Sequence, residues 1–264
     1  MKPIQVKGKI KLAAIDPGET DGLKKEQAAK LLERERERID LLQEKLYAED
    51  QRSLLVVLQG MDTSGKTGTI KAVFTAMNPH GLEVTGFGPP SDLERDHDFL
   101  WRVHQRAPRR GNVACFDRSH YEDVLVVRVK KLVPEKVWKE RYRQINDFEA
   151  MLADRGTKVI KFFLHIDRAE QKERLEARLA DREKLWKFRL GDLEDRALWD
   201  EFQAAYEDAL EKCSTDDAPW YVVPANKKWF RNLLVARTVA DTIQAMGPKP
   251  RRPDFDPKTV KVPD

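Results

Sequence analysis

The sequence predicts an α/β fold in which a five-stranded parallel sheet is sandwiched by helices. Five short apolar runs, at 54–58, 82–87, 112–117, 158–167 and 220–224, alternate with stretches whose apolar residues recur at helical spacing. Such alternation produces a parallel sheet covered on both faces. A glycine-rich segment, Gly60 to Thr67, directly follows the first run. We therefore expect the binding loops at the carboxyl ends of the strands.

The helical patterns lie at 23–49, after residue 67 as far as Asn78-Pro79, and at 92–106, 121–131, 134–154, 169–212 and 228–246. The 169–212 pattern is interrupted around 188–191. Residues 1–22 lack periodicity, which predicts an N-terminal arm across the surface or toward a partner subunit. We expect one domain over 23–246, with a helical lid at about 170–195. The proline-rich, basic residues 247–264 are expected to form an extended tail.

Composition narrows the class of protein. The 264 residues carry 49 Lys+Arg against 45 Asp+Glu, a net charge of +4 that does not indicate a nucleic-acid binder. Cys115 and Cys213 form no CxxC pair, which argues against a disulfide framework or a zinc site. No segment approaches eighteen apolar residues, so we expect a cytoplasmic protein without a membrane partner. The histidines lack paired ligand spacing.

The segment Gly60-Met61-Asp62-Thr63-Ser64-Gly65-Lys66-Thr67 has the pattern of a phosphate-binding P-loop between a strand and a helix. Its glycines let consecutive backbone N–H groups, including those of Thr63 and Ser64, face one anion, and the helix dipole adds positive potential. Lys66 reaches a transferable phosphoryl group, and the Thr67 hydroxyl is a typical Mg²⁺ ligand. A glycine-rich turn without a ligand has the same geometry and is the alternative.

Carboxylates beside this loop point to a kinase of small phosphorylated acceptors. Asp62 repels phosphate unless a metal ion or an acceptor hydroxyl lies between them. Asp117 ends a strand, as the Mg²⁺-holding carboxylates of P-loop enzymes do, and Arg118 follows it. Asp117 as the N-cap of the next helix is an alternative. Glu122 is either a third carboxylate at the metal or the acceptor, or an ordinary exposed residue.

Arg174, Arg178 and Arg182 recur every four residues, so a helix places them on one face. On a mobile lid, such cations close over phosphates and exclude water. Ion pairs with nearby glutamates on a solvated helix are the alternative. Phe87 lies near the second strand end, where an acceptor base stacks. Two prolines follow Gly86-Phe87-Gly88, which excludes a dinucleotide fingerprint.

Four segments together resemble the type 2 polyphosphate kinase family. They are Gly60 to Thr67, Phe99-Leu100-Trp101-Arg102, Phe116 to Leu125 (FDRSHYEDVL) and Ala218-Pro219-Trp220, and the resemblance spans 23–246. It implies a P-loop kinase fold and a Mg²⁺-dependent, reversible transfer of phosphoryl groups from inorganic polyphosphate to nucleotides. It also implies homo-oligomers, here a homodimer or a homotetramer.

The resemblance assigns roles to individual residues. Asp62 corresponds to the aspartate at the metal and the acceptor phosphate, Lys66 to the loop lysine, and Arg178 to the lid arginine. Asp117 and Arg118 match the second motif. The remaining candidates are Arg102 and Phe87 in the acceptor region, Glu122 as a metal or nucleotide ligand, and Arg174 and Arg182 as further polyphosphate ligands.

Glu122 stands where relatives specialised for diphosphate acceptors tend to carry Asn. The resemblance therefore implies the subclass that accepts both AMP and ADP. Two rival functions stay open: a thymidylate-kinase-like nucleotide kinase that uses ATP as donor, and a non-catalytic P-loop protein whose basic lid binds nucleic acid. No nucleic-acid partner is expected under the main interpretation.

Overall fold

The computed structural model describes residues 2–256 and 258–263. Its sheet has the strand order β1-β6-β5-β2-β4-β3. The strands are β1 (Ile4–Gln5), β2 (Ser53–Gln59), β3 (Leu82–Gly86), β4 (Val113–Asp117), β5 (Thr157–His165) and β6 (Trp220–Pro224). Strands β2 to β6 are parallel, which confirms the predicted core of the sheet.

The sheet has one strand more than predicted, and this strand makes the sheet mixed. Residues of the N-terminal arm form β1, which pairs antiparallel with the edge of β6 (Ile4 opposite Val222). The Val6 N–H then donates to the Trp220 carbonyl over 2.9 Å. Two residues are too few for an alternating pattern to be recognised in the sequence.

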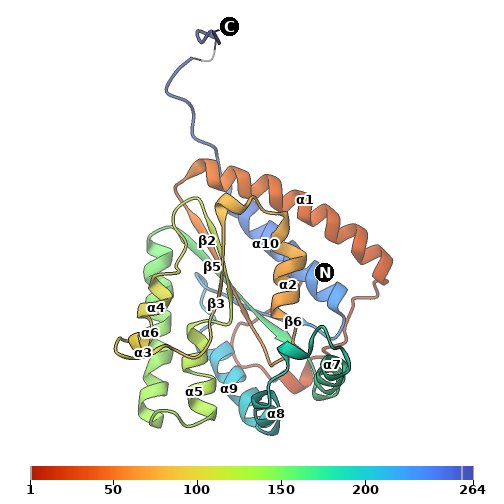
Figure 1. The fold of residues 1–264 in the computed structure, drawn as a ribbon. Coiled ribbons are helices and arrows are strands. Elements are labelled where there is room, and N and C mark those ends of the chain that lie inside the picture. Colours follow the sequence, from red (N-terminus) through yellow and green to blue (C-terminus); the bar gives the residue numbers. More distant parts are fainter. Residues whose placement is uncertain (1, 257, 264) are drawn as a thin grey trace.

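The helices form two layers around the sheet. They are α1 (Lys25–Glu49), α2 (Lys66–Val73), α3 (Asp92–Arg95), α4 (Trp101–His104), α5 (Val126–Val129), α6 (Glu135–Asp154), α7 (Arg168–Ala180), α8 (Gly191–Ala197), α9 (Trp199–Lys212) and α10 (Lys228–Met246). Helices α1, α2 and α10 pack together on one face, and α5, α6 and α9 lie on the other (Figure 1). No helix of the described residues is long and apolar enough to span a bilayer.

Two helix predictions were too long. The capping box of Ser91 and Glu94 begins α3, but the Asp98 carboxylate accepts the Leu100 N–H and draws the chain out of the helix before α4. The predicted 121–131 helix is a 3₁₀ turn, His120–Asp123, followed by the four residues of α5. Here Ser119 caps the turn by accepting the Tyr121 N–H.

The burial of each strand depends on its position in the sheet, and the register of the strands locates the site. Every residue of β2 is buried, whereas β3, at the free edge of the sheet, is largely exposed. Register places Leu58 of β2 beside Asp117 at the end of β4. The glycine-rich loop after β2 and the motif after β4 therefore meet at the carboxyl edge of the sheet.

Candidate active site

The loop from Gly60 to Gly65 has a backbone that needs glycine at both ends. Gly60 has φ +150°, and a Cβ there would lie 2.7 Å from the Leu164 carbonyl oxygen. Gly65 has φ +101°, and its Cβ would lie 1.8 Å from Nη1 of Arg231. Within the described part of the chain, the buried hydroxyls of Thr63 and Ser64 have no hydrogen-bond partner. Unpaired donors around a left-handed loop at a helix N-terminus are suited to an anion.

Lys66 begins α2 and folds back across its own loop. Its buried ammonium donates to the Gly60 carbonyl over 2.7 Å and to the Met61 carbonyl over 3.4 Å. Burial, followed by the neighbouring Arg118 cation, lowers the pKa of Lys66. A phosphate at the loop would offset this unfavourable charging.

Thr67, in the first turn of α2, contacts Asp117 at the end of β4. The Thr67 hydroxyl donates to the Asp117 carboxylate over 2.8 Å. The cap alternative for Asp117 does not hold, because Ser119 supplies the capping oxygen of the following turn. A hydroxyl and a carboxylate in contact beside a phosphate loop are the hard oxygen ligands that Mg²⁺ prefers.

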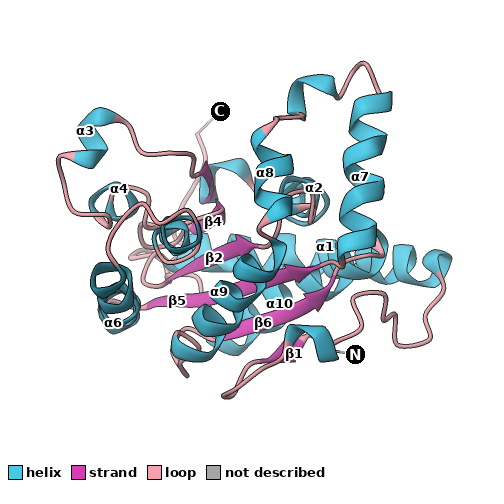
Figure 2. Cartoon of the chain, turned by 90° about the horizontal axis from the view of Figure 1, so that it is seen from below, coloured by secondary structure: helices cyan, strands magenta, loops and turns pink. Residues whose placement is uncertain are grey.

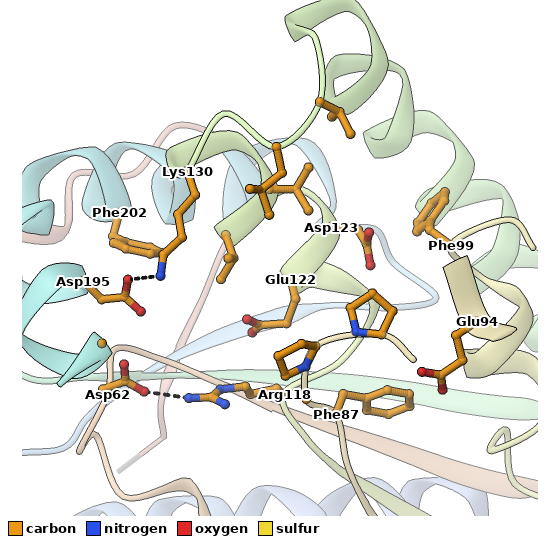
Figure 3. A pocket seen from close by; sticks show the side chains of 18 of the residues that line it. Asp62, Phe87, Glu94, Phe99, Arg118, Glu122, Asp123, Lys130, Asp195 and Phe202 are labelled. Atoms are coloured by element: carbon orange, nitrogen blue, oxygen red, sulfur yellow. Dashed lines mark hydrogen bonds and ion pairs between the residues drawn. The ribbon is translucent and has the colours of Figure 1, made fainter. Parts of the chain in front are cut away.

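Asp62 and Arg118 form an ion pair at the centre of the site, with 2.7 Å between carboxylate and guanidinium (Figure 3). Burial opposes ionisation of Asp62, but the Lys66 and Arg118 cations outweigh it and lower the pKa of this carboxyl. Arg118 adopts φ +64°, a left-handed conformation that is uncommon for a residue with a side chain. Its backbone N–H donates to the Leu58 carbonyl.

A cavity of about 700 Å³ opens beside this pair. Asp62 and Arg118 lie at its base and Glu122 points into it (Figure 3). Its apolar wall includes Phe87, Phe99, Val126, Val127, Leu132 and Phe202. Burial raises the pKa of Glu122 above its usual value, even though Arg118 opposes the shift. The cavity thus combines an apolar wall with a charged end, as a site for an aromatic phosphate ester does.

Arg102 lies in the wall of this cavity rather than free within it. Its buried guanidinium donates to the Gly88 carbonyl over 2.8 Å and lies 5.5 Å from the Phe87 ring centroid. The Asp123 carboxylate lies 4.0 Å from Arg102 and accepts from Arg141 over 2.9 Å. Arg102 therefore links the acceptor region after β3 to the motif after β4.

Helix α7 brings a second arginine to the loop. Helices α7 and α8 lie beyond the carboxyl edge of the sheet (Figure 2). Near the end of α7, Arg178 lies 3.6 Å from the Asp192 carboxylate of α8, and it is close enough to Asp62 to lower that carboxyl's pKa. Burial and the Asp62 charge raise the pKa of Asp192.

Comparisons with known proteins identify the family of this chain. The model of the family described as Polyphosphate kinase 2 (PPK2) matches residues 22–251. The chain belongs to the polyphosphate kinase 2 family. The AMP/ADP-polyphosphate phosphotransferase of Meiothermus ruber is 52% identical, with 98% of both chains covered. The ADP-polyphosphate phosphotransferase of Rhodopseudomonas palustris is 41% identical, with 84% of this chain and 81% of that protein covered.

The fold is also that of a solved polyphosphate kinase 2. The crystal structure of the protein from Arthrobacter aurescens TC1 matches with a TM-score of 0.90 and 42% identity, covering 97% of this chain and 96% of that one. A structure of a putative polyphosphate kinase 2 from Pseudomonas aeruginosa has a TM-score of 0.84 and 35% identity, and this chain covers 50% of it. The predicted resemblance and the P-loop kinase fold are confirmed.

Two lid arginines lie elsewhere than predicted for this polyphosphate kinase 2 chain. Arg174 is buried, and its guanidinium donates to carbonyls of Thr63, Ser64, Ala225 and Asn226 and to the Glu170 carboxylate, so it braces the loop from behind. Arg182 lies beyond the last residue of α7 and is exposed. The predicted row of three cations on one helical face is therefore wrong, and of the three only Arg178 contributes to the electrostatics of Asp62.

Several residues of the site had no clear signal in the sequence. Asp192 and Asp195 both lie in α8, and Asp195 pairs with Lys130, another residue that lines the cavity, over 2.6 Å (Figure 3). Arg231 of α10 donates to the Ser64 carbonyl behind the P-loop. Asp123 is the exception, because it lies within the motif FDRSHYEDVL that carried the resemblance.

Proposed function

We propose that this protein is a Mg²⁺-dependent phosphotransferase that moves phosphoryl groups reversibly between inorganic polyphosphate and nucleoside mono- and diphosphates. The observation that carries the proposal is the convergence of Asp62, Arg118 and Arg178 beside the P-loop lysine. The Meiothermus ruber relative, with 52% identity over almost the whole chain, bears the name AMP/ADP-polyphosphate phosphotransferase.

The donor binds at the loop. Backbone N–H groups from Gly60 to Gly65 and the Lys66 ammonium bind the donor phosphates, and the unpaired hydroxyls of Thr63 and Ser64 add donors. Arg118, paired with Asp62, and Arg178, whose charge also acts on Asp62, stabilise the charge on the moving phosphoryl group. Phosphoryl transfer needs little beyond such positioning and electrostatic stabilisation.

Residues that fit Mg²⁺ are present. Asp117 and Thr67, already in contact, would hold the ion with help from Asp62. Among residues 2–256 and 258–263, no three His, Cys, Asp or Glu side chains form a metal cluster, which agrees with an ion bound mainly through substrate phosphates and water. Held by Asp117, Thr67 and Asp62, the ion would neutralise part of the charge of the phosphates. Glu122 points into the cavity, and we assign it to the acceptor.

The cavity takes the nucleotide acceptor. Its apolar wall at Phe87 and Phe99 contacts the base, and Arg118 and Glu122 face the acceptor phosphates. The cavity volume of about 700 Å³ accommodates a nucleotide. The acceptors are then both AMP and ADP, as Glu122 implies.

The decisive experiment is a matrix of donors and acceptors with purified protein and Mg²⁺. Polyphosphate with AMP should give ADP and ATP, and polyphosphate with ADP should give ATP. ATP with a nucleoside monophosphate tests the rival nucleotide kinase. Transfer from ATP but not from polyphosphate would establish that rival, and no transfer from any donor would overturn the enzyme proposal.

The nucleic-acid rival loses its main support, because the continuous basic face it needs is broken by the burial of Arg174. Retention of RNA at moderate salt without phosphoryl transfer would restore it. The proposal also includes assembly into a homodimer or homotetramer, which light scattering after size exclusion measures directly.

A further inference from the structure

Four polar side chains form a buried cluster outside the cavity. Lys161 of β5, Glu149 of α6, and His120 and Tyr121 of the turn after β4 are each at most 1% exposed. Lys161 pairs with the Glu149 carboxylate and donates to the Tyr121 hydroxyl over 2.8 Å. Tyr121 in turn donates to Glu149 over 2.9 Å, and His120 contacts the same carboxylate over 3.2 Å.

Stability alone does not account for this cluster. Removing two charges from water costs several kcal/mol per ion, and a well-packed apolar pair is often as stable as a buried ion pair. The residues at equivalent positions of β5 are apolar: Val159 and Phe163, two residues before and after Lys161 and on the same face of the sheet, are both buried. The ion pair instead fixes geometry, because its hydrogen bonds set the orientation of the partner side chains.

The cluster holds the segment that carries two residues of the site. His120 and Tyr121 lie between Arg118, which pairs with Asp62, and Glu122, which points into the cavity. The Tyr121 ring also packs edge-on against Trp220 at 4.8 Å between centroids. Arg118 has a left-handed backbone that persists only where its surroundings determine it. Strand β4 fixes the chain before Arg118, and the cluster fixes it afterwards.

We propose that the Lys161–Glu149–Tyr121–His120 cluster positions Arg118 and Glu122 for phosphoryl transfer, with Tyr121 as its central positioning residue. The inference rests on the proposed function, since it assigns the cluster to the acceptor side of that reaction. None of the four side chains lines the cavity, so their effect on the substrates passes through Arg118 and Glu122.

The test is Tyr121→Phe, which removes one hydroxyl and keeps the ring against Trp220. We expect kcat/KM for AMP to fall about tenfold, with KM for polyphosphate unchanged. Backbone amides of residues 118–125 should exchange hydrogen faster than in the parent protein. The matched control is Ser53→Ala, which removes the buried 2.9 Å hydrogen bond to Thr157 at the opposite end of β2. The control should lose stability but keep both the kinetics and the exchange of 118–125.

A second variant separates positioning from stability. Lys161→Met combined with Glu149→Leu replaces the ion pair by apolar side chains, and we expect a folded protein with the same acceptor-side loss. Parent-like kcat/KM for AMP and parent-like exchange in Tyr121→Phe would overturn the inference. An inactive parent protein would overturn the proposed function instead. Hydrogen exchange of residues 118–125, compared between the cluster variants and Ser53→Ala, would still decide whether the cluster holds this segment.

Discussion

At the scale of single residues, the site is built from unlike charges that alternate. The charges of Lys66, Arg118 and Arg178 of α7 all act on the Asp62 carboxylate. Because these cations lower the pKa of Asp62, the carboxylate is ionised throughout the neutral range. Asp62 holds Arg118, and the Gly60 and Met61 carbonyls hold Lys66, so both cations are in place before a phosphate binds.

Asp62→Asn tests this arrangement. The substitution keeps the size of the side chain and removes its charge, so Arg118 loses its ion-pair partner and, under the proposed function, Mg²⁺ would lose a ligand. We expect kcat/KM for AMP to fall about a hundredfold or more, with the circular dichroism spectrum unchanged. Asp40→Asn, on the exposed surface of α1, is the control and should have parent-like kinetics. Full activity in Asp62→Asn would contradict the role.

The opposite pKa shifts of Glu122 and Asp62 predict opposite effects on the pH dependence of stability. Glu122 has a raised pKa, so its ionisation is less favourable in the folded chain than in the unfolded one. This penalty is absent below the unfolded pKa, near 4.5, and complete above the folded one. Glu122→Gln should therefore have a higher Tm than the parent at pH 7.5, and the difference should vanish toward pH 4.

Asp62→Asn should behave in the reverse sense in the same thermal scans. The lowered pKa of Asp62 contributes stability above the unfolded value of 3.8, and this contribution is lost as pH falls through the folded pKa. The variant is then less stable than the parent at neutral pH. Equal pH profiles for the two variants would show that the opposite pKa shifts of these carboxyls are wrong.

At the scale of elements, helix α7 and the P-loop are joined by hydrogen bonds. Helix α7 carries Arg174, which donates to the loop carbonyls of Thr63 and Ser64, and one turn later Arg178. The Gln171 amide of the same helix donates to the Asp62 carbonyl over 3.2 Å. The first part of α7 is thus fixed to the loop, whereas Arg178 lies nearer its free end.

This difference predicts that the same Arg→Lys substitution has unequal effects at positions 178 and 182. Arg178→Lys keeps the charge but loses the planar guanidinium that contacts two groups at once, and we expect kcat to fall about a hundredfold. Arg182→Lys changes an exposed side chain and should alter kcat by less than about threefold. Steady-state kinetics with saturating polyphosphate and AMP measure both. Similar losses in the two variants would restore the predicted row of phosphate-binding arginines.

Four of the five parallel strands could be predicted because each is a largely apolar run, and the residues at their ends could be placed together because parallel strands end at one edge of the sheet. The fifth, β3, was also predicted, although its sequence LEVTG is mixed and largely exposed. Thr67 and Asp117 lie fifty positions apart, yet the register of β2 with β4 brings them within 2.8 Å. Helical spacing did not reveal the use of Arg174, since its carbonyl partners depend on where the P-loop and the end of β6 meet. The position of Asp192 in the site depends likewise on how the chain after α7 folds back.

At the scale of the whole molecule, the N-terminal arm closes one edge of the sheet. Strand β1 pairs with β6, and the Ser214 hydroxyl donates to the Val6 carbonyl over 2.7 Å. Val6 itself is buried. The opposite edge, β3, lies beside the cavity, so the arm and the site occupy different ends of the strand order. An uncovered strand edge pairs readily with other chains.

Removing residues 2–10 should therefore destabilise the protein without altering its chemistry. The deletion exposes the β6 edge and the surface under Val6, and we expect Tm to fall by about 3 to 8 °C together with increased light scattering on heating. The kcat of the folded fraction should stay within about twofold of the parent value, because none of the deleted residues lines the cavity. Truncation after Pro253 is the matched control, since the residues described beyond it are all exposed, and Tm should not change. A deletion variant with parent Tm but lost activity would instead place the arm in a functional contact, such as one between subunits.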